Sequence, residues 1–428
     1  MLERLYALET SGIKLGLENI TRLCAALGHP EQQFMSIHVA GTNGKGSVTA
    51  MVHTGLVAAG VHAARYTSPH LVDLRERFVI GDAPVDAASL EQAAQDVLDC
   101  AERLHADGTL SVHPTFFEAT TAIAFELFRR ARVDVAVIEV GLGGRFDSTN
   151  ILTPPVGAIT SIGFDHQQYL GDTIAAIAFE KAGIIKPGMT VVTGEMPDEA
   201  RQVISAVAGD RGARVVDAAA GTQVQGDVQD GRATLVIETT EDRYGPLTLG
   251  LRGEHQRGNA LVALRLLEAV RATGLRLSGD AIERGLTGVE WPARLELIRL
   301  PDGKQILLDA AHNVDGARAL AAYLARWHPD RPALVIGVMR DKDVEGMIDE
   351  LMPVVSSVTA TAAATPRAIP ADELAARVRA RRGDVQADAD PVRAIEDALL
   401  RHDTVCVAGS IFLAGDVRDV LKRRAILR

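Results

Sequence analysis

The feature that most constrains this chain is a glycine-rich turn between a short apolar run, residues 34–40, and a stretch with apolar residues at helical spacing, residues 48–56. The turn consists of Gly41, Thr42, Asn43, Gly44, Lys45, Gly46 and Ser47. A short apolar run that leads through glycines into a helix is typical of a buried strand in a parallel sheet. The turn therefore predicts an α/β fold in which it ends a strand and opens a helix.

The composition of the turn predicts that it binds a polyphosphate. Glycines let the backbone approach phosphate oxygens, and the free N–H groups at a helix start point at them. Lys45 supplies positive charge, and Ser47 supplies a hydroxyl that suits magnesium. Gly46 separates these two residues, which departs from the common pattern G-x-x-x-x-G-K-[ST]. A flexible glycine turn without a ligand is the alternative, and it is weaker because the lysine and the hydroxyl follow a strand.

Length and composition bound the class of protein. A chain of 428 residues exceeds what one hydrophobic core usually serves, so two domains are expected. A net charge of -11, without a basic block interleaved with aromatic residues, argues against a nucleic-acid partner. The start lacks a basic region followed by an apolar core, and no apolar run would span a bilayer, which predicts a cytoplasmic protein. The cysteines are predicted to be buried free thiols: Cys24, Cys100 and Cys406.

Strand-like runs alternate with helical patterns along the chain, which predicts mostly parallel sheets. These runs are residues 133–140, 156–162, 189–193, 305–308, 333–338 and 404–408. Residues 194–251 change to Gly, Asp and Thr with alternating strands, and they are predicted to form a small β-rich insertion. Glycine and proline break the pattern around Pro292, so we expect an amino-terminal domain of residues 1–292 and a carboxy-terminal domain of residues 293–428.

Polar side chains follow other predicted strands of the first domain. Glu139 comes near the end of one strand and is a candidate magnesium ligand beside Ser47, because magnesium prefers hard oxygen donors. Its alternative role is a carboxylate that only caps the sheet edge. His166 follows another strand and could complete a magnesium or manganese site, although a surface histidine is an equal alternative.

A second group of polar residues lies just beyond the predicted boundary. Asp309 and His312 follow the run 305–308, and Arg294 follows the boundary itself. Asp309 could accept hydrogen bonds from ribose hydroxyls, while His312 and Arg294 could contact phosphates. A cleft between domains is a common place for such a ligand. Each of these residues, taken alone, is more often structural.

A dinucleotide-binding oxidoreductase is the rival that the glycines suggest. Its fingerprint, G-x-G-x-x-G, fails after Gly141 and Gly143, because the third glycine position is Phe146. The turn that begins at Gly41 also lacks the second glycine of that pattern. The sequence therefore disfavours this class.

Taken together, these segments resemble one family, the folylpolyglutamate synthases and dihydrofolate synthases, which are relatives of the Mur ligases. The resemblance spans nearly the whole chain in order. It rests on residues 38–47, 67–71, 75–77, 139–145, 165–166, 170–173, 180–183, 255–256, 259–260, 291–292, 294, 309, 312–313 and 341–343. The chain departs from the family's common pattern at Ala293 and Ala310, where relatives often have glycine, and at Val314, where proline is frequent.

The resemblance implies roles for particular residues. It implies magnesium ligands at Ser47, Glu139 and His166, and a carbamylated lysine at Lys181. On composition alone Lys181 would be a solvated charge or a helix cap, whereas a carbamate would give a second magnesium ion an anionic oxygen donor. Lys45, Lys181 and His166 are then the implied catalytic residues. The implied ATP-binding set adds to residues 42–47 the side chains of Asn259, Arg294, Asp309 and His312, and the implied folate contacts are Thr67, Ser68, Pro69, His70, Leu71 and Arg75.

The reaction implied by the resemblance is an ATP-dependent ligation. The γ-phosphoryl group of ATP passes to a carboxylate of dihydropteroate or a reduced folate, and the amine of L-glutamate attacks the resulting acyl phosphate. Lys45, the helix start and magnesium would stabilise charge on the transferring group. Closure of two domains would keep water from the acyl phosphate.

The fold implied by the resemblance is α/β. It is a P-loop-containing, mostly parallel sheet with a small β-rich insertion, followed by a smaller Rossmann-like α/β domain, in a protein expected to be a monomer. Two other hypotheses stay open. One is a Mur-type ligase of a UDP-sugar peptide, against which Gly46 and the folate-like loop 67–71 argue, and the other is a nucleotide-binding regulator without ligase activity.

Overall fold

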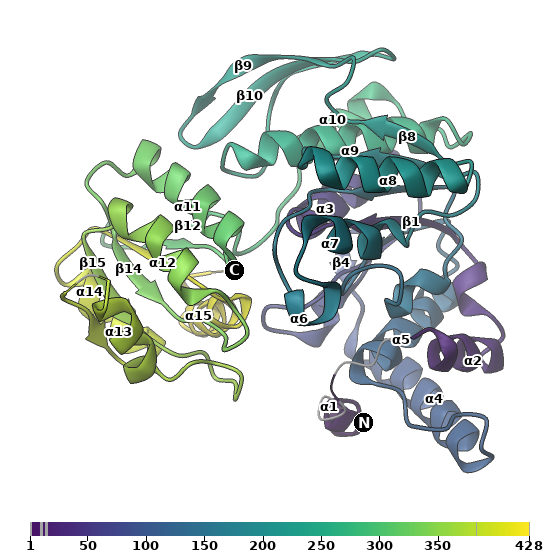
Figure 1. The fold of residues 1–428 in the computed structure, drawn as a ribbon, viewed down its shortest axis with the longest axis horizontal. Helices are drawn as coiled ribbons and strands as arrows, with labels where there is room; N and C mark the ends of the chain where they lie inside the picture. Colours follow the sequence, from purple (N-terminus) through teal and green to yellow (C-terminus); the bar gives the residue numbers. More distant parts are fainter. Residues whose placement is uncertain (1, 9–11, 13–15, 382, 428) are drawn as a thin grey trace.

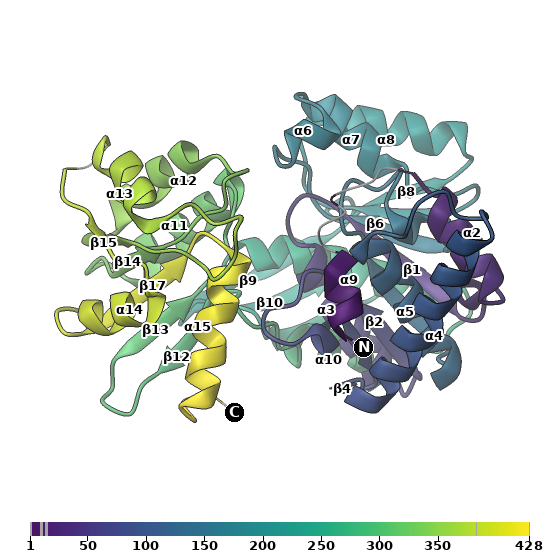
Figure 2. The ribbon, with the colours of Figure 1, turned by 90° about the horizontal axis from the view of Figure 1, so that it is seen from below.

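Two sheets organise the chain, and each forms the centre of one lobe of the computed structural model (Figure 1). The structure describes residues 2–8, 12, 16–381 and 383–427. The larger lobe carries the amino-terminal sheet and a small three-stranded sheet, and the smaller lobe carries the carboxy-terminal sheet. The same two lobes stand side by side when the molecule is seen from below (Figure 2).

The main sheet of the larger lobe is mostly parallel, as the β/α alternation predicted. Its strands, from edge to edge, are β4 (Ala83–Pro84), β3 (Phe78–Ile80), β2 (Ala63–Tyr66), β5 (Val135–Glu139), β1 (Met35–Ala40), β6 (Val156–Ile159), β7 (Thr190–Thr193) and β8 (Arg214–Asp217). Only β3 and β4 run antiparallel to their neighbours. The strand order changes direction at β1, which places the glycine turn at the kind of switch point where open α/β sheets bind ligands.

Helices cover both faces of this sheet. They are α1 (Leu2–Ala7), α2 (Glu18–Ala26), α3 (Lys45–Ala58), α4 (Ala87–Ala106), α5 (Phe116–Ala131), α6 (Gln167–Leu170), α7 (Ile174–Ala182), α8 (Asp198–Asp210), α9 (His255–Arg271) and α10 (Gly279–Thr287). Ile37, Val39, Val135 and Val137 pack on one face with α3, α9 and α10. Because side chains alternate along a strand, Glu139 shares the face of Val135 and Val137 and therefore points to the side of α3.

The prediction for residues 194–251 is only partly right. Residues 198–210 form helix α8, and β8 extends the main sheet. A separate antiparallel sheet is formed only by β9 (Gln223–Gln229), β10 (Arg232–Glu238) and β11 (Arg243–Thr248). Helix α8 buries Ala200, Ile204 and Ala208, whose four-residue spacing is helical and was hidden by the polar residues around it.

The smaller lobe is a second α/β layer structure. Its sheet has the order β12 (Glu296–Arg299), β13 (Gln305–Leu308), β17 (Thr404–Ala408), β14 (Ala333–Ile336), β15 (Ser357–Ala360) and β16 (Gln386–Ala387). All neighbours except β12 and β13 are parallel. Its helices are α11 (Val314–Trp327), α12 (Val344–Leu351), α13 (Ala371–Arg379), α14 (Pro391–Leu399) and α15 (Ile411–Arg423). The predicted strands 305–308 and 404–408 are confirmed to the residue.

The remaining elements agree with the composition. All three cysteines are buried and free, as predicted. Among the helices of the described residues, none is long and apolar enough to cross a membrane.

Two fully buried histidines give the larger lobe a dependence on pH. His38 in β1 has Nε2 2.8 Å from Thr149 Oγ1, and His53 in α3 has Nδ1 3.5 Å from Nη1 of Arg65. Burial lowers the pKa of each histidine to about 3, and the positive charges of Lys186 and Arg65 add to this effect. Both side chains therefore stay neutral in the folded protein at pH 5.

Acid should weaken the fold for this reason. Histidine in an unfolded chain has a pKa of about 6.5, so below that pH the unfolded chain binds protons that the folded chain does not. Stability should be complete above pH 6.5 and should fall as the pH is lowered toward 3. At pH 5 the loss is about 2 kcal/mol for each buried histidine. Urea unfolding at pH 7.5 and pH 5 measures it, and His38→Gln should reduce the difference by about 2 kcal/mol. An unchanged difference in His38→Gln would refute this account.

Candidate active site

The glycine turn lies between β1 and α3, as predicted, and two of its glycines are required by space. Gly41 and Gly44 have φ of +148° and +86°, and Gly44 caps the amino terminus of α3. A Cβ at Gly41 would overlap Thr160 Oγ1, and one at Gly44 would overlap Asn259 Oδ1. The turn is therefore held tightly from two sides, by Thr160 and by Asn259.

The segment after β6 braces the turn. The N–H of Thr42 donates to the carbonyl of Ser161 at 2.7 Å, and the N–H of Asn43 donates to Ser161 Oγ at 3.1 Å. Thr160 Oγ1 donates to the carbonyl of Asn43 at 2.6 Å, and Thr42 Oγ1 lies 3.0 Å from the N–H of Gly163. These bonds fix the conformation of the turn without a bound ligand.

Two lysine amines meet at one carbonyl of the turn. Lys45 Nζ and Lys181 Nζ each donate to the carbonyl oxygen of Gly41 at 3.0 Å, and Lys45 also donates to the carbonyl of Thr42 at 3.2 Å. The acceptors of both amines within the described residues are backbone carbonyls, not carboxylates. Lys45 therefore brings positive charge to the start of α3, where the helix dipole adds to it.

Burial changes the chemistry of Lys181. Its side chain lies at the end of α7 and is only 5% exposed. Desolvation lowers the pKa of Lys181 to about 7, and the nearby charge of Lys45 contributes. A large share of this amine is therefore neutral and nucleophilic near neutral pH, unlike that of an ordinary lysine.

Glu139 is a buried carboxylate on the same side of the sheet. It is 5% exposed, and its Oε2 accepts the N–H of Ser68 at 3.2 Å. Burial raises the pKa of Glu139, while Lys45, the Ser68 N–H and Arg294 act in the opposite direction. The carboxylate thus faces cations but forms no direct ion pair within the described residues, which leaves its oxygens available to a metal ion.

Helix α9 reaches Ser47 from the other side. Gln256 Nε2 donates to Ser47 Oγ at 3.4 Å, and Asn259 Nδ2 donates to Gln256 Oε1 at 2.9 Å. The structure thereby brings Asn259 to the turn, next to Gly44. Gln256 links the two side chains; the sequence had included it in the resemblance, within residues 255–256, but had given it no role.

Asp165 joins the two lobes. Its carboxylate lies 2.6 Å from Lys342 Nζ and 3.6 Å from His312 Nε2, and it accepts from Asn313 Nδ2 at 3.3 Å. Burial alone would raise the pKa of Asp165, but His312, His166 and Lys342 outweigh burial and hold this pKa far below its usual range. The sequence had singled out Asp165 only as the neighbour of His166, and Lys342 had no role.

His166 lies at the edge of this group. It caps α6 with a left-handed φ of +51°, and its Nε2 is 3.5 Å from Lys342 Nζ. Burial lowers the pKa of His166 to about 4, with Lys342 and Lys45 adding to it and Asp165 opposing it. The ring is therefore neutral near pH 7, which is the form that binds metal ions.

Further contacts cross the gap between the lobes beside the turn. The side-chain amides of Asn43 and Asn313 pair at 3.1 and 3.4 Å. Within the smaller lobe, Asp309 accepts the N–H groups of Leu295 and Ala311 at 2.8 and 2.9 Å. Burial lowers the pKa of Arg294, and the charges of Asp309 and Glu139, one from each lobe, oppose this.

The loop 67–71 lies on the same edge of the sheet. Glu76 organises it by accepting the N–H groups of Leu71 and Asp73 at 2.8 and 3.2 Å. His70 Nδ1 accepts from Arg77 Nε at 2.9 Å, and a Cβ at Gly415 of α15 would overlap the carbonyl of Leu71. The loop is therefore packed against the smaller lobe.

Arg75 is the predicted site residue that the structure does not bring to the others. Its guanidinium pairs with Asp73 at 2.6 Å and is 42% exposed. Asp73, two residues earlier, holds the Arg75 side chain away from the other site residues. The sequence pattern did not reveal this ion pair.

Within residues 2–8, 12, 16–381 and 383–427, no three His, Cys, Asp or Glu side chains lie close enough to hold a metal ion alone. The predicted ligand set draws on other donors, namely a hydroxyl and a carbamate. The Glu139 carboxylate, which accepts one N–H at Oε2, and the Ser47 hydroxyl at the start of α3 have the hard-donor chemistry that magnesium prefers. The residues present therefore fit this ion.

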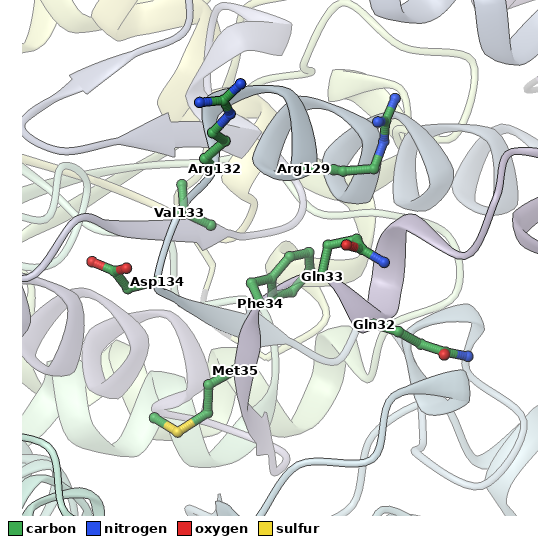
Figure 3. A pocket seen from close by; sticks show the side chains of 8 residues that line it. All are labelled: Gln32, Gln33, Phe34, Met35, Arg129, Arg132, Val133 and Asp134. Atoms are coloured by element: carbon green, nitrogen blue, oxygen red, sulfur yellow. The ribbon is translucent and has the colours of Figure 1, made fainter.

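A shallow hollow of about 750 Å³ lies elsewhere, and Figure 3 shows it closely. Its lining residues are Gln32, Gln33, Phe34, Met35, Arg129, Arg132, Val133 and Asp134. They lie at the amino-terminal ends of β1 and β5, opposite to the glycine turn. No predicted site residue lines it.

Comparison with known proteins places both lobes in one group. The Mur ligase middle domain matches residues 39–267, and the Mur ligase glutamate ligase domain matches residues 293–411. Folylpolyglutamate synthase of Lacticaseibacillus casei is 35% identical over 411 residues, which cover 94% of this chain and 93% of that protein. Dihydrofolate synthase/folylpolyglutamate synthase of Bacillus subtilis is 34% identical, over 96% of each chain.

A solved structure agrees with these similarities. Folylpolyglutamate synthase of Mycobacterium tuberculosis, complexed with ADP and AMPPCP, superposes with a TM-score of 0.91 at 35% identity. The alignment covers 98% of this chain and 97% of that one. Both lobes and their arrangement are thus similar to those of a nucleotide-bound relative.

Proposed function

Because this chain belongs to the folylpolyglutamate synthase and dihydrofolate synthase family of the Mur ligases, we propose that it is an ATP-dependent ligase that joins L-glutamate to dihydropteroate, to reduced folates, or to both. The γ-phosphoryl group of ATP passes to the acceptor carboxylate, which yields ADP and an acyl phosphate. The amine of glutamate attacks the acyl carbon, phosphate leaves, and an amide bond forms.

The observation that carries this proposal is the meeting of Lys45 and Lys181 at the Gly41 carbonyl. Lys45 and the helix start, with no carboxylate paired to this lysine in the described part of the chain, form a site for a polyanion, and Lys181 beside them is the amine that we propose to be carbamylated. In the proposed reaction Lys45 moves from the Gly41 carbonyl to the phosphates. There it stabilises the charge on the transferring phosphoryl group.

The other residues of the site take supporting roles. Residues 42–47 bind the phosphates, with Asn259 beside the turn, and Arg294, Asp309 and His312 bind the nucleotide from the smaller lobe. The loop of Thr67, Ser68, Pro69, His70 and Leu71 contacts the folate-type acceptor. Arg75 belongs to that set only if the loop rearranges, since it is paired with Asp73. We also retain the domains predicted from the sequence, residues 1–292 and 293–428.

Magnesium is proposed to bind at Ser47, Glu139 and His166, with carbamylated Lys181 as an additional ligand. When bound, it would neutralise phosphate charge during phosphoryl transfer. Lys181 supports the carbamate because an amine with a pKa of about 7 offers a neutral nitrogen to carbon dioxide. The product is an anionic group in a place where Lys45 already supplies a cation.

We further propose a cytoplasmic monomer. Three buried free thiols fit a reducing compartment. One chain carries both halves of the site, as the contacts between Asp165 and Lys342 illustrate, so the reaction needs no second copy.

The test is phosphate release from ATP by the purified protein with glutamate and either dihydropteroate or tetrahydrofolate. Turnover should require both an acceptor and glutamate, and mass spectrometry should find one added glutamate per phosphate. Turnover with a UDP-muramoyl peptide would instead favour the Mur-type ligase. Nucleotide binding with no turnover on any acceptor would favour the regulator.

A further inference from the structure

The connection between the lobes contacts the phosphate-binding turn through the side chain of Trp291. A Cβ at Gly46 would lie 2.9 Å from both Cζ2 and Nε1 of Trp291, closer than real contacts allow. Gly46 is helical and needs no glycine for its backbone conformation. A glycine is needed at position 46, between Lys45 and Ser47, because the indole of Trp291 occupies the space that a side chain would fill.

A second contact holds the indole from β2. The guanidinium carbon of Arg65 lies 5.1 Å from the centre of the Trp291 ring, which is the distance of a cation–π interaction. Arg65 forms no ion pair within the described residues, and its Nη1 lies 3.5 Å from Nδ1 of the neutral His53 ring. The indole thus has one fixed place, in contact with both Gly46 and Arg65.

The chain that follows Trp291 is tied to the smaller lobe within a few residues. The N–H of Ala310 donates to the carbonyl of Ala293 at 2.9 Å. The N–H of Leu295 donates to Asp309 Oδ2 at 2.8 Å. Trp291 is therefore the last fixed point on the larger lobe before Arg294 and Asp309.

We propose that Trp291 is a positioning residue. By packing against Gly46, its indole sets the positions of Arg294 and Asp309 relative to the phosphate-binding turn. Only Pro292 separates Trp291 from Ala293, whose carbonyl is hydrogen-bonded to Ala310 of the smaller lobe, so a rotation of that lobe strains the contact of the indole with the start of α3. Nucleotide bound at the turn and the position of the smaller lobe are therefore coupled through this contact. The kinetic part of this inference rests on the proposed ligase function.

The kinetic test adds a Cβ at position 46, where it would clash with the indole of Trp291. Gly46→Ala should lower kcat/KM for ATP by about 10- to 100-fold, because small displacements of catalytic groups cost that much. The matched control is Gly209→Ala, a helical glycine in α8 with nothing within 4 Å of the added Cβ, which should leave kcat/KM unchanged. Trp291→Phe should keep most activity, since the ring still contacts Gly46. Trp291→Leu should lower kcat more than it changes KM for ATP.

The double variant Gly46→Ala/Trp291→Leu tests whether the loss in Gly46→Ala comes from the clash with the indole. The smaller leucine leaves room for the added methyl group, so the double variant should be more active than Gly46→Ala alone. A double variant that is only as poor as the two single losses combined, or equal kinetics in Gly46→Ala and Gly209→Ala, would overturn the proposal. If Trp291→Leu fails to fold, the comparison of Gly46→Ala with Gly209→Ala still tests the proposal.

A binding experiment tests the coupling without ligase turnover. The chain has two tryptophans, so Trp327→Phe leaves Trp291 as the only indole reporter. Saturation with AMPPCP and magnesium should change the emission of Trp291, and Gly46→Ala should abolish the change while calorimetry still detects nucleotide. Constant emission during calorimetric binding would overturn the inference even if the ligase assay succeeds. A response of Trp291 in a protein that lacks ligase turnover would uphold the contact and refute only the proposed function.

Discussion

Lys181→Ala should lower kcat/KM for ATP by about 10³-fold, the scale expected when a charged group at the transferring phosphoryl is lost. The lysine is 5% exposed, and its amine has a pKa of about 7. The variant removes the nitrogen that carries the proposed carbamate, and with it one anionic ligand of magnesium. Steady-state phosphate release with saturating glutamate and acceptor measures the loss.

A small carboxylate should restore part of this activity. Formate fits the space left by the lysine side chain and supplies the oxygen donors of the carbamate, so turnover of Lys181→Ala should rise with formate concentration. Lys181→Arg should be inactive and should not respond, because its guanidinium stays charged and fills the space. The matched control is Lys186→Ala. Lys186 donates to the carbonyl of Asn150 at 2.8 Å and lies outside the site, so its loss should leave turnover within about a few-fold of wild type. An active Lys181→Ala enzyme without formate would exclude the carbamate.

The sequence predicted the local frame of the site because that frame depends on short-range patterns. The apolar run before Gly41 and the apolar spacing after Ser47 specify β1 and α3, and the structure confirms both. Glu139 ends β5 and Asp165 follows β6, the strands on either side of β1, and the carboxyl ends of parallel strands meet at one edge. Their approach to the turn therefore followed from topology alone.

Contacts between distant segments were beyond that kind of reasoning. The spacing of Gly46 in the turn was visible, but its partner Trp291 lies 245 residues later, and only the fold brings the two together. The ion pair of Asp165 with Lys342 likewise joins two lobes. The residue types show that a buried charge or indole needs a contact partner, but they do not show which residue of a distant segment lies within contact distance.

Backbone strain near the connection shows the same limit. Ala293 has a left-handed φ of +54°, a conformation that is unfavourable for residues other than glycine. The sequence had marked this position as a departure from glycine in similar proteins. The physical reason for glycine there, a positive φ beside the seat of Trp291, required the structure.

Glu139→Gln should lower kcat by about 10²- to 10³-fold and raise the magnesium concentration needed for half-maximal activity. Glutamine has nearly the same shape and can still accept the N–H of Ser68, so the loop 67–71 should keep its place. What is lost is the negative charge, which a buried site needs in order to bind magnesium near the cations Lys45 and Arg294. Magnesium titrations of phosphate release at saturating ATP measure both effects.

The control for this substitution is a second buried glutamate of the same lobe. Glu126 is 3% exposed and pairs with Arg129 and Arg130 on α5, away from the glycine turn. Glu126→Gln removes an equally buried charge, so it should lower the melting temperature but should leave the magnesium dependence of turnover unchanged. If both variants lost stability and neither shifted the magnesium titration, Glu139 would be only a structural carboxylate at the end of β5. A shift confined to Glu139→Gln would instead assign the metal to the edge of the sheet where the phosphate-binding turn begins.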